Sequence, residues 1–310
     1  MRVAVTGSAG FLGREVVRTL AAKGHDVTAV TRARADIIGA SCCLPVGNLL
    51  DANLAKICSG QDAIVNCAAR VHITGRENPV AAQEAYDAMN ARFPVALAVA
   101  AQEEGVSRFV QISSVAAIKS LTDEGEVADD QTAPDPQTPY GRSKLKADIE
   151  LARYATHQFS VASLRPPALF GQGVGAWFRS FARLAKTGFP LPIGRINNRR
   201  SFMSVRNFAD AVAATIDSNV AGAFIVTDSD PISSAELYRL LQSACGKKAR
   251  TPNAPAGIVR TFARSALQGR ATSLLGNAVY DGSQFAEQLC WSAPFGFERE
   301  IGRAVGDLLS

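Results

Sequence analysis

This 310-residue sequence has few histidines, no cysteines at metal-binding spacings and no long apolar runs. Its three histidines form no H-x-x-x-H pattern, and its six cysteines show no C-x-x-C spacing. Structural metal sites use such spacings, so we expect no metal. The cysteines also lack the density of a small secreted scaffold, which favours free thiols in a reducing compartment.

No apolar stretch reaches the roughly 20 residues that a bilayer span requires, and Met1-Arg2 leads straight into an apolar strand pattern without a secretory leader. We therefore expect a cytoplasmic protein without membrane insertion. The net charge is +5, but the basic residues are spread along the chain and cluster most tightly at 195–200. An anionic small molecule explains that cluster at least as well as nucleic acid, so we expect no nucleic-acid partner.

Apolar runs alternate with helical patterns through the first half of the chain, which is typical of a parallel sheet covered by helices on both faces. We predict strands at Arg2–Thr6, Asp26–Thr31, Cys42–Val46, Asp62–Cys67, Arg108–Ser113 and Phe159–Arg165. We predict helices at about Gly10–Lys23, Asp51–Cys58, Pro79–Glu104 and Pro139–His157. The fold class is therefore α/β, with a Rossmann-type, doubly wound parallel sheet.

After Arg165 the pattern changes to Pro/Gly-punctuated loops and isolated helices. We interpret 1–165 as a dinucleotide-binding domain that carries the catalytic groups. Residues 166–310 are mainly a smaller substrate lobe, with one strand at Ala223–Thr227 that returns to the sheet. The acidic stretch Asp123–Asp130 is expected to be a solvated loop.

The first turn after a strand holds Thr6-Gly7-Ser8-Ala9-Gly10-Phe11-Leu12-Gly13. Gly7 permits a tight turn, Gly10 lets backbone amides approach a pyrophosphate, and Gly13 allows the helix to pack against the strand. The helix N-terminus then faces the anion. This pattern predicts a dinucleotide site.

The end of the second predicted strand indicates which dinucleotide binds. An acidic residue there would accept hydrogen bonds from the ribose of NAD, but this chain has Arg32 and Arg34. Two guanidiniums can pair with the 2′-phosphate of NADP, so NADP(H) is favoured and NAD(H) remains an alternative.

Tyr140 and Lys144 lie four residues apart in a predicted helix and therefore share one face. A nearby ammonium favours phenolate, so we expect the Tyr140 pKa to lie below its usual value of about 10. Ser113 and Ser114 end the preceding strand at its carboxyl end, where one hydroxyl can bind the same substrate oxygen. The other serine can simply cap a backbone group.

These motifs resemble the extended short-chain dehydrogenase/reductases of the NAD-dependent epimerase/dehydratase family, and the resemblance covers essentially the whole chain. Thr6–Gly13 matches T-G-x-x-G-x-x-G, Ile112–Val115 matches the catalytic-serine strand, Tyr140 and Lys144 match Y-x-x-x-K, and 164–171 resembles R-P-x-x-x-Y/F-G. The resemblance implies Ser114, Tyr140 and Lys144 as catalytic residues.

The resemblance also implies a set of cofactor-binding residues, and it relates Asn90 to an Asn on the fourth helix. The set is Gly7, Ala9, Gly10, Phe11, Leu12, Gly13, Arg32, Arg34, Asn48, Leu49, Cys67, Ala68, Ala69, Lys144 and Pro166. Two departures stand out: Asn48 occupies the place of a usual Asp near the adenine, and Ile118-Lys119 replaces a usual Tyr-Gly.

Arg200, in Asn198-Arg199-Arg200-Ser201-Phe202, matches the arginine that grips a nucleotide diphosphate in the family. Together with Arg70 and His72, this run is most similar to the bacterial subgroup that reduces UDP-4-keto-6-deoxy-N-acetylhexosamines. The substrate residues implied are Arg70, His72, Ser114 and Arg200, and a homodimer is expected by analogy.

The expected reaction is NAD(P)H-dependent reduction of a C4 carbonyl on a nucleotide sugar, with Tyr140 as the proton donor. A UDP-sugar 4-epimerase would use the same residues. A dinucleotide-binding sensor or assembly factor without catalysis is the alternative of another class.

Overall fold

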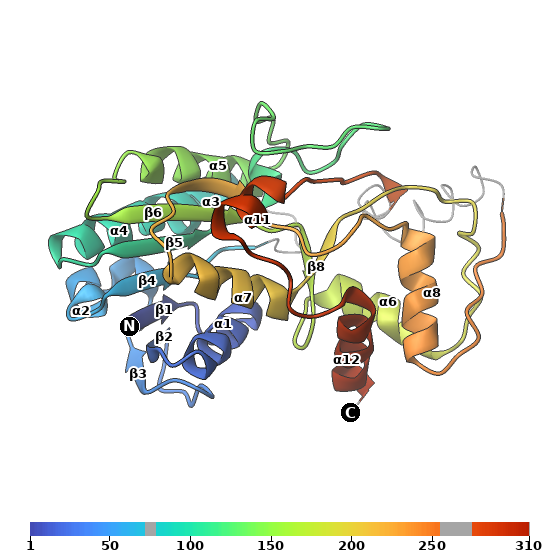
Figure 1. Ribbon diagram of the computed structural model, residues 1–310, viewed down its shortest axis with the longest axis horizontal. Helices are drawn as coiled ribbons and strands as arrows, with labels where there is room; N and C mark the ends of the chain where they lie inside the picture. Colours follow the sequence, from blue (N-terminus) through green and yellow to red (C-terminus); the bar gives the residue numbers. More distant parts are fainter. Residues whose placement is uncertain (72–78, 255–274, 310) are drawn as a thin grey trace.

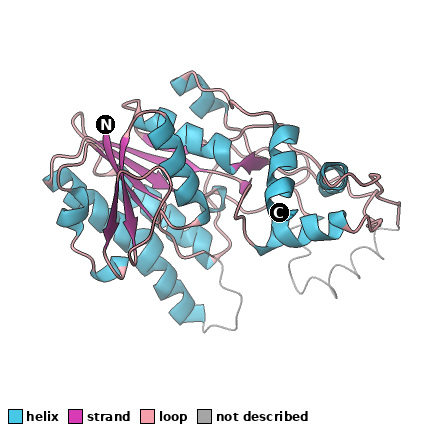
Figure 2. Cartoon of the chain, turned by 90° about the horizontal axis from the view of Figure 1, so that it is seen from below, coloured by secondary structure: helices cyan, strands magenta, loops and turns pink. Residues whose placement is uncertain are grey.

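A computed structural model describes residues 1–71, 79–254 and 275–309. His72 therefore lies outside the described residues. Figure 1 shows the sheet and its helices on one side and a smaller group of helices, including α6 (Ala176–Lys186), α8 (Ser234–Ala244) and α12 (Phe297–Leu309), on the other. Figure 2 shows the same division from below.

The central sheet contains all seven predicted strands, with ends shifted by no more than two residues. They are β1 (Arg2–Thr6), β2 (Asp26–Thr31), β3 (Cys42–Pro45), β4 (Ala63–Asn66), β5 (Arg108–Ile112), β6 (Ser160–Arg165) and β9 (Gly222–Ile225). Every pairing is parallel, in the order β3-β2-β1-β4-β5-β6-β9. The order reverses beside β1, so the carboxyl ends of β1 and β4 flank the topological switch point where such sheets bind ligands.

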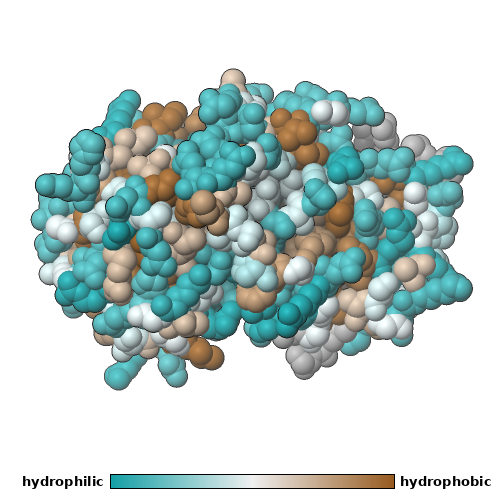
Figure 3. Space-filling view, in the orientation of Figure 1, coloured by the Kyte–Doolittle hydropathy of each residue, from teal (hydrophilic) through white to brown (hydrophobic). Residues whose placement is uncertain are grey.

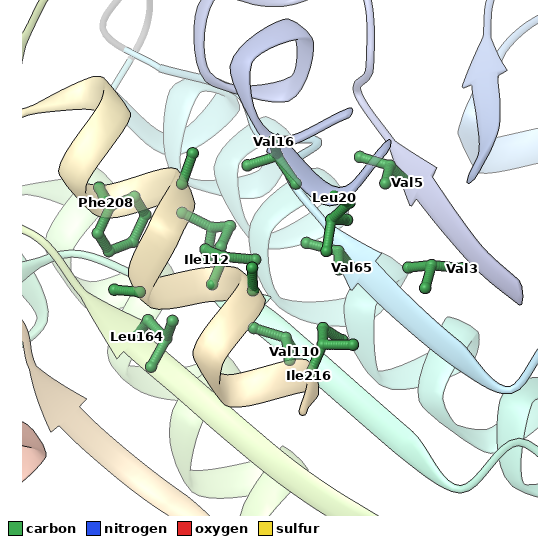
Figure 4. Packing of buried hydrophobic residues seen from close by; sticks show 14 of the residues in the cluster. Val3, Val5, Val16, Leu20, Val65, Val110, Ile112, Leu164, Phe208 and Ile216 are labelled. Atoms are coloured by element: carbon green, nitrogen blue, oxygen red, sulfur yellow. The ribbon is translucent and has the colours of Figure 1, made fainter. Parts of the chain in front are cut away.

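Helices cover both faces because successive strand residues alternate between the faces. Val3, Val5, Val65 and Val110 join a buried cluster with α1 (Phe11–Ala22) and α7 (Val205–Ile216), shown in Figure 4. On the other face, α2 (Leu54–Cys58), α4 (Phe93–Glu103) and α5 (Pro139–Ala152) cover a second cluster. In Figure 3 hydrophilic residues cover most of the visible surface, and apolar ones lie in small separate patches.

The predicted helix Pro79–Glu104 is interrupted. It consists of α3 (Pro79–Asp87), a π-helical turn η2 (Ala88–Arg92) and α4. Pro94 has no N–H and its ring clashes with the carbonyl four residues earlier, that of Asn90, which explains a wider turn at this point. Asn90 is fully buried in that turn.

Two other predicted helices are shorter than expected. Residues 49–58 form a 3-10 turn η1 (Leu49–Asp51) and then α2, because Asn48 and Asn53 each cap a separate start. The helix after Pro139 ends at Ala152, where Arg153 closes the last turn.

The second half of the chain returns to the sheet more often than the division at residue 165 implies. The strand β9 pairs with β6, and α7 packs against α1. Helix α11 (Ser283–Leu289) adds Phe285 to the same core cluster. The smaller lobe combines β7 (Ala168–Phe170), β8 (Phe202–Ser204), α6, α8 and α12 around its own apolar cluster.

Candidate active site

The glycine-rich turn after β1 is built from close backbone contacts. Gly7 has φ +66°, and a β-carbon there would lie 2.7 Å from the Ala68 nitrogen. A β-carbon on Gly13 would overlap the Gly7 carbonyl oxygen. The segment after β4 therefore lies against the turn, which brings the predicted residues Cys67, Ala68 and Ala69 to the same place.

This cradle fits a dinucleotide pyrophosphate. Gly10 is the N-cap of α1 in an extended conformation, and no side chain of the described residues caps the helix. The first-turn amides of Phe11, Leu12 and Gly13 consequently lack intrahelical partners and face outward at the positive end of the helix dipole. Ser8 fixes the turn to the next strand, because its hydroxyl donates to the Val30 carbonyl at 2.8 Å.

Asn48 and Leu49, which were predicted to lie near the adenine, form contacts with neighbouring residues of their own turn and with the core. The Asn48 side-chain oxygen accepts from Leu50 N at 3.3 Å, and its amide donates to Asp51 at 2.7 Å. Leu49 packs against the second core cluster. Asn48 thus shapes the turn after β3, and a contact of Asn48 with a cofactor stays a prediction.

Arg32 and Arg34 follow β2 and are both exposed. Neither guanidinium forms a hydrogen bond or ion pair with any of the residues that the structure describes. The Arg32 carbonyl accepts from Gly47 N at 3.0 Å, which fixes the backbone while leaving the side chain in solvent. Both positive groups are available for an anion.

Tyr140, Ser114 and Lys144 come together at the carboxyl ends of β5 and β6. Ser114 begins the 3-10 turn η3 (Val115–Ala117), and its hydroxyl hydrogen-bonds to the Tyr140 phenol. Lys144 Nζ lies 5.9 Å from the Tyr140 ring centroid and donates to the Ile112 carbonyl at 2.7 Å. Both Tyr140 and Lys144 belong to the first turns of α5.

The expected depression of the Tyr140 pKa is wrong for this structure. Burial raises the Tyr140 pKa to about 12; the Ser114 hydrogen bond opposes this shift, whereas the Asp148 and Tyr86 charges add to it. Burial also lowers the Lys144 pKa to about 8. The Lys144 ammonium donates to the Ile112 carbonyl and not to the phenol. Desolvation is therefore the largest cause of both pKa shifts, upward for Tyr140 and downward for Lys144. The Tyr140 phenol is therefore neutral near pH 7.

Gly141 places Tyr140 beside Ser114, a role that the sequence motif did not reveal. A β-carbon on Gly141 would overlap the Ala116 carbonyl oxygen, so α5 contacts η3 at its first turn. Thr138 caps that turn by accepting from Gly141 N at 3.0 Å. The sequence signal that could have indicated this close contact is the glycine directly after Tyr140.

The two serines have different environments. The Ser113 hydroxyl is buried and donates to Asp148 at 2.9 Å, whereas Ser114 contacts Tyr140. Pro166, predicted beside the nicotinamide, is buried next to this turn, and its carbonyl accepts from Val115 N at 3.2 Å. The geometry thus agrees with Ser114 as the serine of the catalytic set.

Asn90 links the segment after β4 to α5. Its side chain accepts from Arg70 N at 2.8 Å and donates to the Arg70 carbonyl at 2.9 Å. It also donates to Ser143 at 3.0 Å. The Arg70 guanidinium lies 5.5 Å from the Tyr86 ring centroid, and the Tyr86 and Tyr140 rings meet edge to face. The Tyr86 ring therefore lies between the Arg70 guanidinium and the Tyr140 ring. The sequence contains no motif that identifies Tyr86 as part of this site.

Arg200 lies in the other lobe. Its backbone pairs with Ile232, and its guanidinium donates to the Gly276 carbonyl at 2.9 Å. Burial lowers its pKa, and the Tyr280 side chain lies close enough to oppose that shift. The Tyr280 hydroxyl donates to the carbonyl of Lys119, just after η3. This contact links the Arg200 region to the turn that carries Ser114.

Within the described ranges, no group of three or more acidic, cysteine or histidine side chains could hold a metal ion. Those ranges also contain no helix with the length and apolar character needed to cross a bilayer. All six cysteines are unpaired thiols.

A glycine cradle at the switch point and a Ser-Tyr-Lys set with a buried lysine define a dinucleotide-dependent enzyme of the short-chain dehydrogenase/reductase class. The model of the NAD dependent epimerase/dehydratase family matches residues 3–226. A UDP-glucose 4-epimerase of Vibrio cholerae is 30% identical, over 94% of this chain and 90% of its own length.

More distant relatives differ in the compounds that their names state. A 3 beta-hydroxysteroid dehydrogenase/Delta 5-->4-isomerase of Mycobacterium tuberculosis is 29% identical over 80% of this chain and 70% of its own length. The solved UDP-N-acetylglucosamine 4-epimerase of Bacillus cereus superposes with a TM-score of 0.80 at 21% identity, covering both chains fully. The chain belongs to the NAD-dependent epimerase/dehydratase family and is an enzyme of the extended short-chain dehydrogenase/reductase type.

Proposed function

We propose that this enzyme reduces the C4 keto group of a UDP-4-keto-6-deoxy-N-acetylhexosamine with NADPH. The observation that carries the proposal concerns Arg32 and Arg34 after β2. Both are exposed, and neither guanidinium forms an ion pair with a described residue. A reductase consumes reduced cofactor supplied from outside, for which NADPH is a common source. An epimerase instead retains one dinucleotide and returns the hydride to the same sugar.

The residues present can hold NADP(H). The amides at the start of α1 would bind the pyrophosphate, and Arg32 and Arg34 would bind the 2′-phosphate through charge-assisted hydrogen bonds. Lys144 and Pro166 would border the nicotinamide side. When bound, the reduced nicotinamide supplies the hydride.

The chain's own groups supply the proton and the orientation. Tyr140, neutral because its pKa is raised, donates its phenolic proton to the developing O4 alkoxide. Ser114 holds the same oxygen, since its hydroxyl already contacts the phenol. The charged Lys144 stabilises the phenolate that forms after the proton has left.

For the substrate, we propose that Arg200 binds the diphosphate and that Arg70 borders the sugar. A guanidinium matches phosphate oxygens in a planar, bidentate way. The relatives named for UDP-sugars support a nucleotide sugar as the substrate class. In Figure 1, β8, which follows Arg200, lies on the side of the smaller lobe that is nearer to the sheet, where we propose that the sugar nucleotide binds.

A UDP-sugar 4-epimerase is the second candidate, favoured by the Vibrio cholerae relative, which matches almost the whole chain. It would use Ser114, Tyr140 and Lys144 in the same roles but retain NAD. The exposed arginines give this candidate no advantage, because NAD has no 2′-phosphate.

One experiment separates the two candidates. Purified enzyme is mixed with NADPH or NADH and a UDP-4-keto-6-deoxy-N-acetylhexosamine, and dinucleotide absorbance and the NMR spectrum of the product are followed. Stoichiometric NADPH oxidation with formation of a 4-hydroxy sugar is the expected result. In a parallel incubation with NAD and UDP-glucose or UDP-N-acetylglucosamine, conversion to the 4-epimer without net dinucleotide reduction would establish the epimerase instead.

We also propose a homodimer through α3 and α5. Val80 on α3 is 79% exposed and Ile149 on α5 is 50% exposed. A surface hollow lined by Gln83, Asp87 and Lys146 lies between these helices. Sedimentation of the wild type and of Ile149→Glu tests this, because a charge at a dimer seam should yield monomers.

A further inference from the structure

A buried carboxylate lies behind the catalytic residues. Asp148 is on α5, one turn after Lys144 and two turns after Tyr140, so the three share a helix face. One of its oxygens, Oδ2, accepts from the Ser113 hydroxyl at 2.9 Å and from Arg165 Nε at 2.9 Å. The other, Oδ1, is buried and has no hydrogen-bond partner among the residues described.

A second carboxylate shares the same guanidinium. Arg165 NH1 lies 3.9 Å from Asp130 Oδ1, which also accepts from Ile225 N at 2.7 Å. Asp130 was expected in a solvated acidic loop, but its side chain is only 3% exposed. Burial raises the Asp130 pKa to about 6. The single arginine therefore faces two acids and does not fully neutralise Asp148 when both are ionised.

The uncompensated charge matters to Lys144. This ammonium is buried, and its hydrogen-bond partner is the neutral carbonyl of Ile112. Burial lowers the Lys144 pKa to about 8, and the Asp148 charge acts in the opposite direction. Cys67 also faces Lys144, but burial raises the pKa of that thiol to about 12, so it is neutral at pH 7.

The same carboxylate holds the strand end. Ser113 is the residue before Ser114, and its hydroxyl is tied to α5 through Asp148. Arg165, at the end of β6, is tied to the same oxygen. A change at Asp148 thus reaches the serine turn, the tyrosine helix and the strand that leads to Pro166.

We propose that Asp148 is a positioning residue that anchors the Ser113–Ser114 strand end to α5 and keeps the Lys144 ammonium charged. The catalytic part of this inference rests on the proposed function. The electrostatic part concerns the enzyme without ligands, so it can be tested separately.

The test is an NMR titration of the Lys144 ammonium in the full-length, ligand-free protein with isotope-labelled lysine. The Lys144 signal is assigned by its loss in Lys144→Met. Asp148→Asn should lower the Lys144 pKa by about one unit or more, the usual effect of losing one nearby opposite charge. Asp148→Glu should restore it. Glu150→Gln, which removes a half-exposed acid from the same helix, is the matched control and should leave it unchanged.

Asp148→Asn leaves Arg165 buried without its main partner, which can unfold the protein. In that case a triple variant, Asp148→Leu with Arg165→Met and Asp130→Asn, removes the buried arginine together with both acids that face it, a replacement that is often tolerated in cores. Because the triple variant loses one negative charge in net terms, the Lys144 pKa should fall in it also. A folded Asp148→Asn or triple variant with an unchanged Lys144 pKa would overturn the proposal.

Measurements of turnover then separate the catalytic part of the proposal from its electrostatic part. In Asp148→Asn the alkaline limb of the pH profile of kcat/KM should move down together with the Lys144 pKa. A one-unit shift would cut the charged fraction at pH 8 from about one half to about one tenth. A shifted Lys144 pKa in an enzyme that reduces no keto sugar would reject the proposed function and leave the electrostatic role of Asp148 standing.

Discussion

The cofactor cradle and the Arg200 region are held in place by different means. In the cradle, backbone atoms touch backbone atoms: Gly7 meets Ala68, and Gly13 meets Gly7. Around Arg200, contacts join segments more than 30 residues apart, through bridges to Ile232 and a side-chain bond to Gly276. The cradle leaves no room for a side chain, whereas the Arg200 guanidinium is itself one of the contacts that hold its region. Under the proposed function, the first region binds the dinucleotide and the second selects the substrate.

The largest effect should come from the catalytic phenol. Tyr140→Phe removes only the transferable proton, and general acid catalysis of this kind typically contributes about 10²- to 10⁴-fold. We expect kcat to fall by that range, while the Kd for NADPH, measured by fluorescence, changes little. Near wild-type kcat in a folded Tyr140→Phe protein would contradict the mechanism.

A β-carbon in the cradle should damage binding and stability together. Gly13→Ala would overlap the Gly7 carbonyl, and such overpacking typically costs about 1–3 kcal/mol. Thermal unfolding and dinucleotide titration measure both losses. Gly302→Ala in α12 is the control, since its β-carbon would meet no atom of the described part of the chain within 4 Å. If Gly13→Ala behaved like that control, the cradle would be looser than these contacts indicate.

Arg32→Ala with Arg34→Ala should weaken NADPH binding about tenfold or more, because hydrogen bonds to charged groups contribute about 1.5–3 kcal/mol each. NADH binding should change little. Arg153→Ala with Arg183→Ala makes the same change in net charge away from the cradle. Equal losses for both dinucleotides would remove the support for NADPH.

Arg200→Ala should raise the KM for the nucleotide sugar without changing the Kd for NADPH. Arg200→Lys should recover only part of the loss, because an ammonium cannot bind phosphate in a bidentate way. Arg199→Ala, at the exposed neighbouring residue, is the matched control. An unchanged sugar KM and kcat in Arg200→Ala would place this residue outside the substrate site.

The smallest effect concerns Asp130 and pH. Its folded-state pKa is raised to about 6 from 3.8, so the folded protein binds a proton more tightly than the unfolded chain does. This contribution is fully present below pH 3.8 and is lost as pH rises through about 6. Asp130→Asn, which keeps an acceptor for Ile225 N, should therefore gain Tm relative to the wild type as pH rises from 4 to 7. A Tm difference that does not vary with pH would contradict the burial of Asp130.

Local patterns predicted the strands and the positions of the glycine turn and the Tyr140 helix well. Alternating apolar runs identified all seven strands, because burial of a strand leaves a periodic record in consecutive residues. The helix spacing placed Lys144 near Tyr140, and the glycine spacing placed the cradle. The predicted helix ends were less accurate. Asn53 starts a new helix by capping it, and Pro94 interrupts a long helix, and the apolar periodicity that predicted the helices does not register the effect of one residue.

The sequence by itself determined the sheet, the glycine cradle and the placement of Tyr140 and Lys144 on one helix, since each depends on residues that are close together in the chain. Only the tertiary structure decided that Asp130 is buried, that Asp148 joins Ser113 to Arg165, and that the Tyr140 pKa rises instead of falling. These properties depend on solvent exclusion by segments distant in the chain. Desolvation and long-range ion pairing have no local sequence pattern, so the electrostatics of the site emerged only from the assembled fold.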